Sequence, residues 1–125
     1  MNRLVLLADD IEKLRRALAG VLEDAGYQVV QAGTGKEALA HLSSSEFDLF
    51  ITDLMMPGMD GLQLLTELRR TDPDLPIIAM SGAFGGRLLK FASTFGVPTL
   101  EKPFKGTTFL EAAESALAPK ASPAA

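Results

Sequence analysis

The chain of 125 residues contains no cysteine and no tryptophan, and it has a single histidine. Without cysteine it can form neither a disulfide framework nor a thiolate metal site, and this fits an intracellular, cytoplasmic setting. The net charge is −4 and no block of Lys or Arg occurs, which argues against nucleic-acid binding by the chain itself. The amino-terminal apolar run is short and is broken by Asp9 and Asp10, so neither a signal peptide nor membrane insertion is expected.

What the sequence does have is an alternation of short apolar runs with helical patterns, repeated five times. We expect strands at residues 4–8, 27–32, 48–53, 76–80 and 97–100. Between them apolar side chains recur at helical spacing, with Gly26 placed to end the first helix and Asp72 and Pro73 to end the third. The pattern predicts one α/β domain with a parallel sheet over residues 1–118. A flexible Ala/Pro-rich tail is expected at 119–125.

Polar side chains follow four of the predicted strands where each strand ends. Asp9 and Asp10 follow the first strand, and Asp53 closes the third. Ser81 follows the fourth strand and Lys102 the fifth. Because the carboxyl ends of neighbouring parallel strands open on one crevice, we expect these side chains to converge there.

Each of these residues also has a structural interpretation. Asp10 precedes a helix and could simply cap it, Lys102 could be a solvated surface lysine, and Ser81 alone carries little information. Three carboxylates within a few ångströms, however, repel one another unless a cation neutralises them. Oxygen ligands without His or Cys select Mg²⁺ or a similar ion such as Mn²⁺.

Asp53 is the candidate nucleophile of this crevice, since a carboxylate can attack phosphorus and form an acyl phosphate. The incoming phosphoryl group carries its charge on three equatorial oxygens. A bound Mg²⁺, the Lys102 ammonium and the Ser81 hydroxyl could each contact one of them.

These motifs together resemble the receiver domain of two-component response regulators, over residues 3–117. The matching pieces are Asp9-Asp10, Asp53 through Gly61, Ser81-Gly82, and Lys102-Pro103-Phe104. The resemblance implies a flavodoxin-like five-stranded sheet of order 2-1-3-4-5, flanked by five helices. It also implies phosphorylation of Asp53 by a sensor histidine kinase or a histidine phosphotransfer protein.

The same resemblance implies a ligand set and a backbone feature. Asp10, Asp53 and the main-chain carbonyl of Met55 would bind Mg²⁺, with Asp9 acting largely through water. The bond between Lys102 and Pro103 would be cis.

The sequence departs from the family pattern at the switch. Thr99 stands where the family usually carries Tyr or Phe, so the usual aromatic switch cannot be transferred. Gly82, Gly85 and Gly86 either loosen the start of the fourth helix or merely form a tight turn. We expect residues 82–95 to rearrange instead of an aromatic ring. A protein partner or a second copy of the chain, giving a homodimer, would dock on the fourth helix, fifth strand and fifth helix. Phe84, Phe91 and Phe95 are expected in the core, although one of them could be exposed on this docking face.

Hydrolysis of the acyl phosphate depends on a water that approaches in line with the bond. By family analogy the side chains of Met55 and Ala83 border this approach, and neither can orient a water. We therefore expect slow self-dephosphorylation.

Three functions remain at this stage. The favoured one is a non-enzymatic, stand-alone phosphoacceptor that signals through a partner, because no output domain follows Leu117. The second is a Mg²⁺-dependent phosphohydrolase with an aspartyl nucleophile. Enzymes of the haloacid-dehalogenase type, however, carry a second acid two residues after the nucleophile, and this position is Met55 here. The third, a phosphorylation-independent binding module, leaves the acid, hydroxyl and lysine set unexplained.

Overall fold

The computed structural model describes residues 3–58, 60–82 and 86–118. Strands and helices alternate strictly along this part of the chain. In order they are β1 (Leu4–Ala8), α1 (Glu12–Asp24), β2 (Gln28–Ala32), α2 (Gly35–Ser44), β3 (Leu49–Asp53), α3 (Gly61–Thr71), β4 (Ile77–Ser81), α4 (Gly86–Ser93), β5 (Thr99–Glu101) and α5 (Gly106–Leu117).

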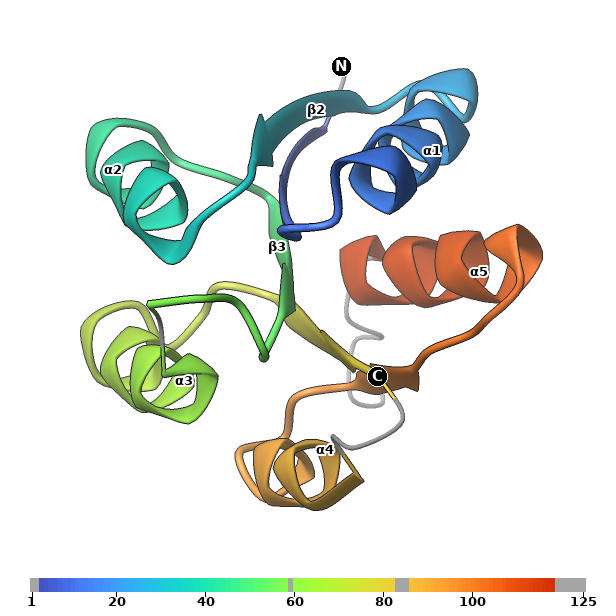
Figure 1. Cartoon of the computed structure of the whole chain (residues 1–125). Coiled ribbons are helices and arrows are strands. Elements are labelled where there is room, and N and C mark those ends of the chain that lie inside the picture. The colour runs from blue at the N-terminus through green and yellow to red at the C-terminus, as the bar shows by residue number, and fades with distance from the viewer. Residues whose placement is uncertain (1–2, 59, 83–85, 119–125) are drawn as a thin grey trace, which may run out of the picture.

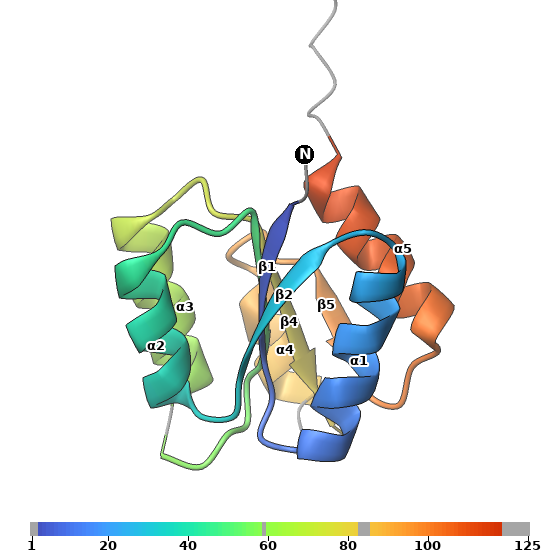
Figure 2. The ribbon, with the colours of Figure 1, turned by 90° about the horizontal axis from the view of Figure 1, so that it is seen from above.

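The strands form one parallel sheet in the order β2-β1-β3-β4-β5, which confirms the predicted topology. Helices α1 and α5 cover one face of the sheet, and α2, α3 and α4 cover the other (Figure 1). Seen from above, the helices flank a twisted sheet whose strands run in the same direction (Figure 2). All carboxyl ends of the strands therefore lie at one edge.

The hydrophobic core consists of two layers, because alternate residues of each strand point to opposite faces. In β1, Val5 and Leu7 pack toward α1 and α5, whereas Leu6 and Ala8 pack toward α2, α3 and α4. Strands β3 and β4 are buried along their whole length. Each large side chain fully buried here contributes roughly 1.5–3 kcal/mol. This burial fixes the strand ends that carry the polar residues.

Most predicted boundaries are confirmed within one or two residues, and the difference at the fifth strand has a cause. Residues 97 and 98 were expected in that strand, but β5 begins at Thr99. Pro98 has no N–H to donate to a ladder, although its carbonyl still accepts a hydrogen bond from the backbone N–H of Ala79. At the end of α1, Gly26 adopts φ 98°, the left-handed conformation predicted for it.

The sequence leaves open that one of the three phenylalanines is exposed, and Phe91 is that residue, with an exposed fraction of 51%. Leu89 and Ala92 are the buried residues of α4, and Phe91 lies about 200° around the helix from Leu89. Phe95 is partly buried as expected, and Phe84 lies outside the described residues. Among the helices described, none is long and apolar enough to cross a bilayer.

Candidate functional site

The three acids predicted to converge do so at the carboxyl edge of the sheet. Carboxylate oxygens of Asp9, Asp10 and Asp53 lie within 4.8 Å of one another. Asp9 is fully buried, Asp53 is 4% exposed, and Asp10 faces solvent. Such a group of hard oxygen donors, open on one side, fits a divalent cation such as Mg²⁺ or Mn²⁺.

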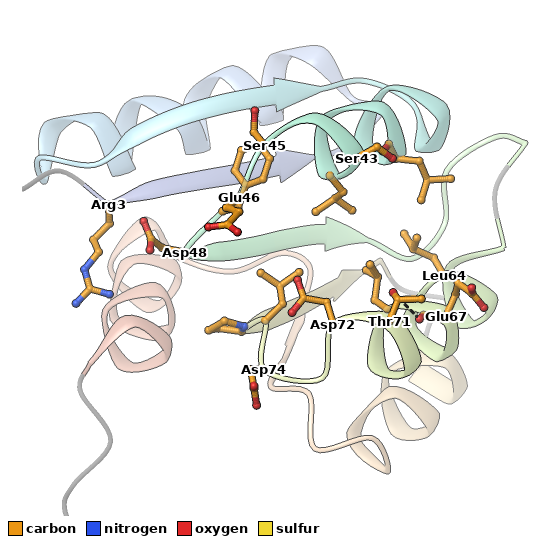
Figure 3. A pocket seen from close by; sticks show the side chains of 16 residues that line it. Arg3, Ser43, Ser45, Glu46, Asp48, Leu64, Glu67, Thr71, Asp72 and Asp74 are labelled. Carbon is orange, nitrogen blue, oxygen red and sulfur yellow. Dashed lines mark hydrogen bonds between the residues drawn. The ribbon is translucent and has the colours of Figure 1, made fainter.

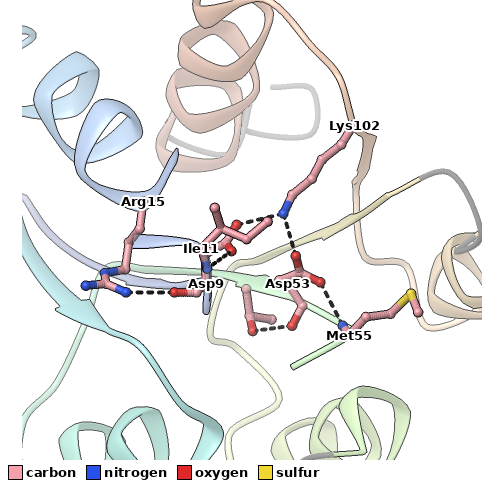
Figure 4. Close-up of polar contacts among 7 residues, drawn as sticks. Asp9, Ile11, Arg15, Asp53, Met55 and Lys102 are labelled. Carbon is pink, nitrogen blue, oxygen red and sulfur yellow. Dashed lines mark hydrogen bonds and ion pairs between the residues drawn. The ribbon is translucent and has the colours of Figure 1, made fainter. Parts of the chain in front are cut away.

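Backbone N–H groups orient the two buried carboxylates (Figure 4). The N–H of Ile11 donates to Asp9 Oδ1 at 2.9 Å, and the N–H of Met55 donates to Asp53 Oδ1 at 2.7 Å. In both cases the donor lies two residues beyond the acid, where the chain turns away from the strand. These bonds leave the second oxygen of each carboxylate directed at the shared space.

Lys102 occupies that space in the structure. Its Nζ lies 2.8 Å from Asp9 Oδ2 and 2.5 Å from Asp53 Oδ2, and its side chain is 14% exposed. Burial works to lower the pKa of this ammonium, but its hydrogen bonds and charge interactions with Asp53 and then Asp9 outweigh burial and raise the pKa above its usual value. Lys102 is therefore a cation held among acids, and the surface-lysine interpretation is wrong.

Ser81 ends β4 beside this group. It is fully buried, and its Oγ has no hydrogen-bond partner among the described residues. Its carbonyl accepts the N–H of Lys102 at 2.8 Å, and its neighbour Met80 pairs with Asp53 in the sheet. A buried hydroxyl without a partner costs about 1–3 kcal/mol, which a ligand oxygen in this crevice would recover.

The turn after Asp53 returns the chain closely against the strand end. Gly58 adopts φ 73°, and a Cβ added to Gly61 would lie 2.6 Å from the carbonyl oxygen and 2.7 Å from the Cα of Leu54. Asp60 caps α3, because its Oδ1 accepts the N–H groups of Leu62 and Gln63. Glycine at 61 thus permits α3 to start directly beside the acids.

The remaining predicted residues differ in their position relative to the cluster of acids, Lys102 and Ser81. Asp10 does not cap α1, because the N-cap position is Ile11, one residue further along the chain, and α1 has no side-chain cap. Met55 exposes 49% of its surface beside Asp53. Thr99 is half-buried and opens β5 opposite Ala79. The peptide bond between Lys102 and Pro103 is cis.

Two supporting residues, Arg15 and Thr52, were missed by sequence reasoning. The Arg15 guanidinium donates from Nη1 to the carbonyl oxygen of Asp9 at 2.9 Å and from Nε to Gln31 at 3.0 Å. The Thr52 hydroxyl donates to the carbonyl oxygen of Asp53 at 2.9 Å. Neither residue belongs to a motif, and the position of Arg15 one turn into α1 is the only signal that could have indicated its contact.

Comparison with known proteins gives consistent matches. The model of the response regulator receiver domain family matches residues 5–114. Sporulation initiation phosphotransferase F of Bacillus subtilis is 31% identical over 84% of this chain and 93% of its own length. The response regulator TrrA of Thermotoga maritima, solved in complex with Mg²⁺ and BeF, aligns with a TM-score of 0.82 at 28% identity, covering 92% of this chain and 99% of TrrA.

Other relatives are much longer than this chain. The C4-dicarboxylate transport transcriptional regulatory protein DctD of Rhizobium meliloti is 45% identical over 62% of this chain, but the match spans only 17% of DctD. The likeness there concerns one module of a larger protein. Together, the parallel sheet, the acids at its carboxyl edge and the match over residues 5–114 show that the chain belongs to the response regulator receiver domain family.

Proposed function

We propose that this chain is a phosphoacceptor that receives a phosphoryl group on Asp53 and passes the signal to a protein partner. The observation that carries the proposal is the buried carboxylate of Asp53 beside two further acids and a bridging Lys102, together with a buried Ser81 hydroxyl that has no partner in the described part of the chain. The donor would be a sensor histidine kinase or a histidine phosphotransfer protein of the cytoplasm. The unit that accepts the group is residues 1–118.

The transfer needs positioning more than covalent chemistry from the protein. A carboxylate oxygen of Asp53 forms the bond to phosphorus while the bond from phosphorus to the donor nitrogen breaks, and the electron pair leaves with that nitrogen. The Met55 N–H holds the carboxylate in place. Lys102, which bridges Asp9 and Asp53, would then bind a phosphoryl oxygen, and Ser81 would donate its hydroxyl to another.

The acids around Asp53 would hold a divalent cation during this transfer. Asp10, Asp53 and the main-chain carbonyl of Met55 would bind Mg²⁺ or Mn²⁺, with Asp9 acting largely through water. The bound cation supplies positive charge that offsets the repulsion between phosphoryl oxygens and carboxylates. The complex of TrrA with Mg²⁺ and BeF supports such a site in a relative.

Incubation with acetyl phosphate followed by intact-mass measurement tests the proposal. We expect one phosphoryl adduct with Mg²⁺, none in the presence of a chelator, and none in Asp53→Asn. A stable adduct separates the phosphoacceptor from a phosphohydrolase, which would release phosphate with continuous turnover, and from a binding module, which would not react. Labelling that persists in Asp53→Asn or without metal would overturn the assignment.

The signal would leave the site through α4 rather than through an aromatic switch. Thr99 has no ring to move, whereas Ser81 leads directly into residues 82–95 and α4 packs on β4 and β5. The exposed Phe91 gives α4 an apolar contact for a partner. The face formed by α4, β5 and α5 would bind the downstream protein, or a second copy of the chain.

Hydrogen exchange with and without Mg²⁺ and beryllofluoride tests this output route. We expect protection to change in residues 82–95 and on the face of α4, β5 and α5. Changes restricted to α1 and α2 would show that the output face is elsewhere. Because beryllofluoride binding itself reports on Asp53, this outcome is distinguishable from a failure of the phosphoacceptor site.

A further inference from the structure

A groove of about 700 Å³ lies between α2 and α3, near the amino ends of the strands (Figure 3). It is remote from the phosphoacceptor crevice, which lies at the carboxyl ends. Its lining comes from α2 and α3 and from the segments that lead into β1, β3 and β4. The apolar part includes Leu39, Leu42, Phe47, Leu64, Leu68 and Leu75.

The groove exists because α2 and α3 pack against other elements rather than against each other. Helix α2 packs on β1 and β2, and α3 packs on α4, while contact between α2 and α3 is weak at most. Leu64 and Leu68 form part of the hydrophobic core, whereas Leu39 is 45% exposed. A single exposed leucine is ordinary on a protein surface. Here, however, it lines the same groove as the buried Leu64, Leu68 and Leu75.

The rim of the groove is strongly acidic. Five carboxylates line it, from Glu46, Asp48, Glu67, Asp72 and Asp74, against the one guanidinium of Arg3. Glu67 is paired with Arg70, and Asp48 accepts the backbone N–H of Leu4. Glu46, Asp72 and Asp74 form no ion pair among the described residues and are exposed. Their negative charge is therefore open to an incoming cation.

We propose that this groove binds a cationic amphipathic helix of a partner protein. Two helices on the same face of the sheet form its long walls, the arrangement that receives a helix laid between them. Apolar side chains at i, i+3, i+4 and i+7 of the partner would contact Leu39, Leu42 and Phe47. Lysine or arginine side chains flanking that stripe would meet the carboxylates of Glu46, Asp72 and Asp74.

The charge pattern favours such a partner over an acidic or purely apolar one. An acidic segment would bring like charges against five carboxylates, and an apolar segment would leave the acidic rim without partners. Since none of the lining residues belongs to the phosphoacceptor crevice, the interaction requires neither metal nor phosphorylation. This surface is thus separate from the α4, β5 and α5 face proposed for output.

A designed probe peptide tests the proposal on the full chain without metal or phosphodonor. The probe is a fluorescent helix of about 18 residues, long enough to be stable, with leucine along one face and lysine elsewhere. Its binding is followed by fluorescence anisotropy, and the contact surface is mapped by amide chemical shifts. We expect saturable binding, with shifts concentrated in α2, α3 and the 45–48 and 72–76 segments.

Variants of the chain distinguish the groove from general attraction to an acidic protein. Leu39→Lys, and Glu46→Lys combined with Asp74→Lys, should each weaken binding at least about tenfold. Glu23→Lys combined with Asp24→Lys changes the net charge by the same amount on exposed residues outside the groove, and should alter affinity by less than about twofold. A peptide of the same composition with leucine spread around the helix should bind more weakly.

Three results would overturn the proposal. Equal weakening by the two double charge reversals would show that only net charge matters. Shifts located on α4 or α5 would place the peptide elsewhere. Concentration-dependent dimerisation of the free chain that Leu39→Lys abolishes would show that a second copy occupies the groove instead, with the cationic helix α4 as its candidate contact.

Discussion

Carboxylates gather at both ends of the sheet, but under opposite conditions. At the carboxyl end, Asp9 and Asp53 are almost completely buried, and their oxygens accept hydrogen bonds from backbone N–H groups and Lys102. At the amino end, Glu46, Asp72 and Asp74 are exposed around an apolar groove.

The comparison between the two ends shows that burial changes what a carboxylate can do. A buried carboxylate loses its hydration and must be compensated by a fixed cation or donors, so its chemistry depends on its immediate contacts. An exposed carboxylate is screened by salt beyond about 8 Å and mainly attracts or repels an approaching partner. The carboxyl end is accordingly suited to phosphoryl chemistry and the amino end to recognition.

Removing the cation of the buried group should have the largest effect. We expect Lys102→Ala to lower the free energy of unfolding by about 3 kcal/mol without metal, because two buried acids lose their counter-charge. Added Mg²⁺ should restore part of the loss. Urea unfolding with a chelator and then with Mg²⁺ measures both effects. Lys105→Ala, an exposed neighbour, is the control, and an equal loss in this variant would contradict the role of Lys102.

Close packing at the carboxyl end predicts the next effect. Gly61→Ala should destabilise the protein by roughly 2 kcal/mol, because the new Cβ would collide with the backbone of Leu54. Gly20→Ala, in α1 with open space around it, should instead stabilise by up to about 1 kcal/mol. Thermal unfolding compares the two variants. If the two variants shifted the unfolding temperature by similar amounts in the same direction, the close approach of α3 to the site would be refuted.

The lifetime of the phosphorylated protein should respond to Met55. Met55 is 49% exposed beside Asp53, and its side chain cannot orient a water. We expect Met55→Asn to accelerate hydrolysis about tenfold, or about 1.4 kcal/mol in barrier, measured as decay of the adduct after donor removal. Ala83→Glu is expected to act in the same direction, although Ala83 lies outside the described residues. Leu39→Asn, similarly exposed at the groove, should leave the lifetime unchanged; equal acceleration there would exclude a local effect.

The smallest effect is expected from reversing charge at the amino end. Glu46→Lys combined with Asp74→Lys should change the free energy of unfolding by no more than about 0.5 kcal/mol, because both side chains are exposed. The rate of labelling by acetyl phosphate should also stay the same. A large loss of stability, or a large fall in the labelling rate, would mean that the two ends of the sheet are coupled. That would contradict the separation described above.

The carboxyl end could be predicted from sequence because its residues follow apolar strands directly. Once β1, β3, β4 and β5 are recognised as parallel, Asp9, Asp53, Ser81 and Lys102 must share an edge. Contacts that depend on the rotation or approach of helices could not be predicted in this way. The exposure of Phe91 and the close approach of Gly61 to Leu54 both follow from how a helix packs on the sheet.

The groove was not predicted for the same reason. Its apolar residues look like ordinary core positions in the sequence, and only the spacing between α2 and α3 leaves Leu39 and Leu42 at an open surface. Its acids are scattered from Glu46 to Asp74 and form no motif.

Mapping the modified residue tests the central claim most directly. After labelling with acetyl phosphate and Mg²⁺, borohydride reduces an acyl phosphate to an alcohol, so that a phosphorylated aspartate becomes homoserine. Tandem mass spectrometry should find homoserine at position 53 and aspartate unchanged at positions 9 and 10. Homoserine at position 9 or 10, or phosphate on a serine or threonine with position 53 unmodified, would contradict the assignment of Asp53 as the phosphoacceptor.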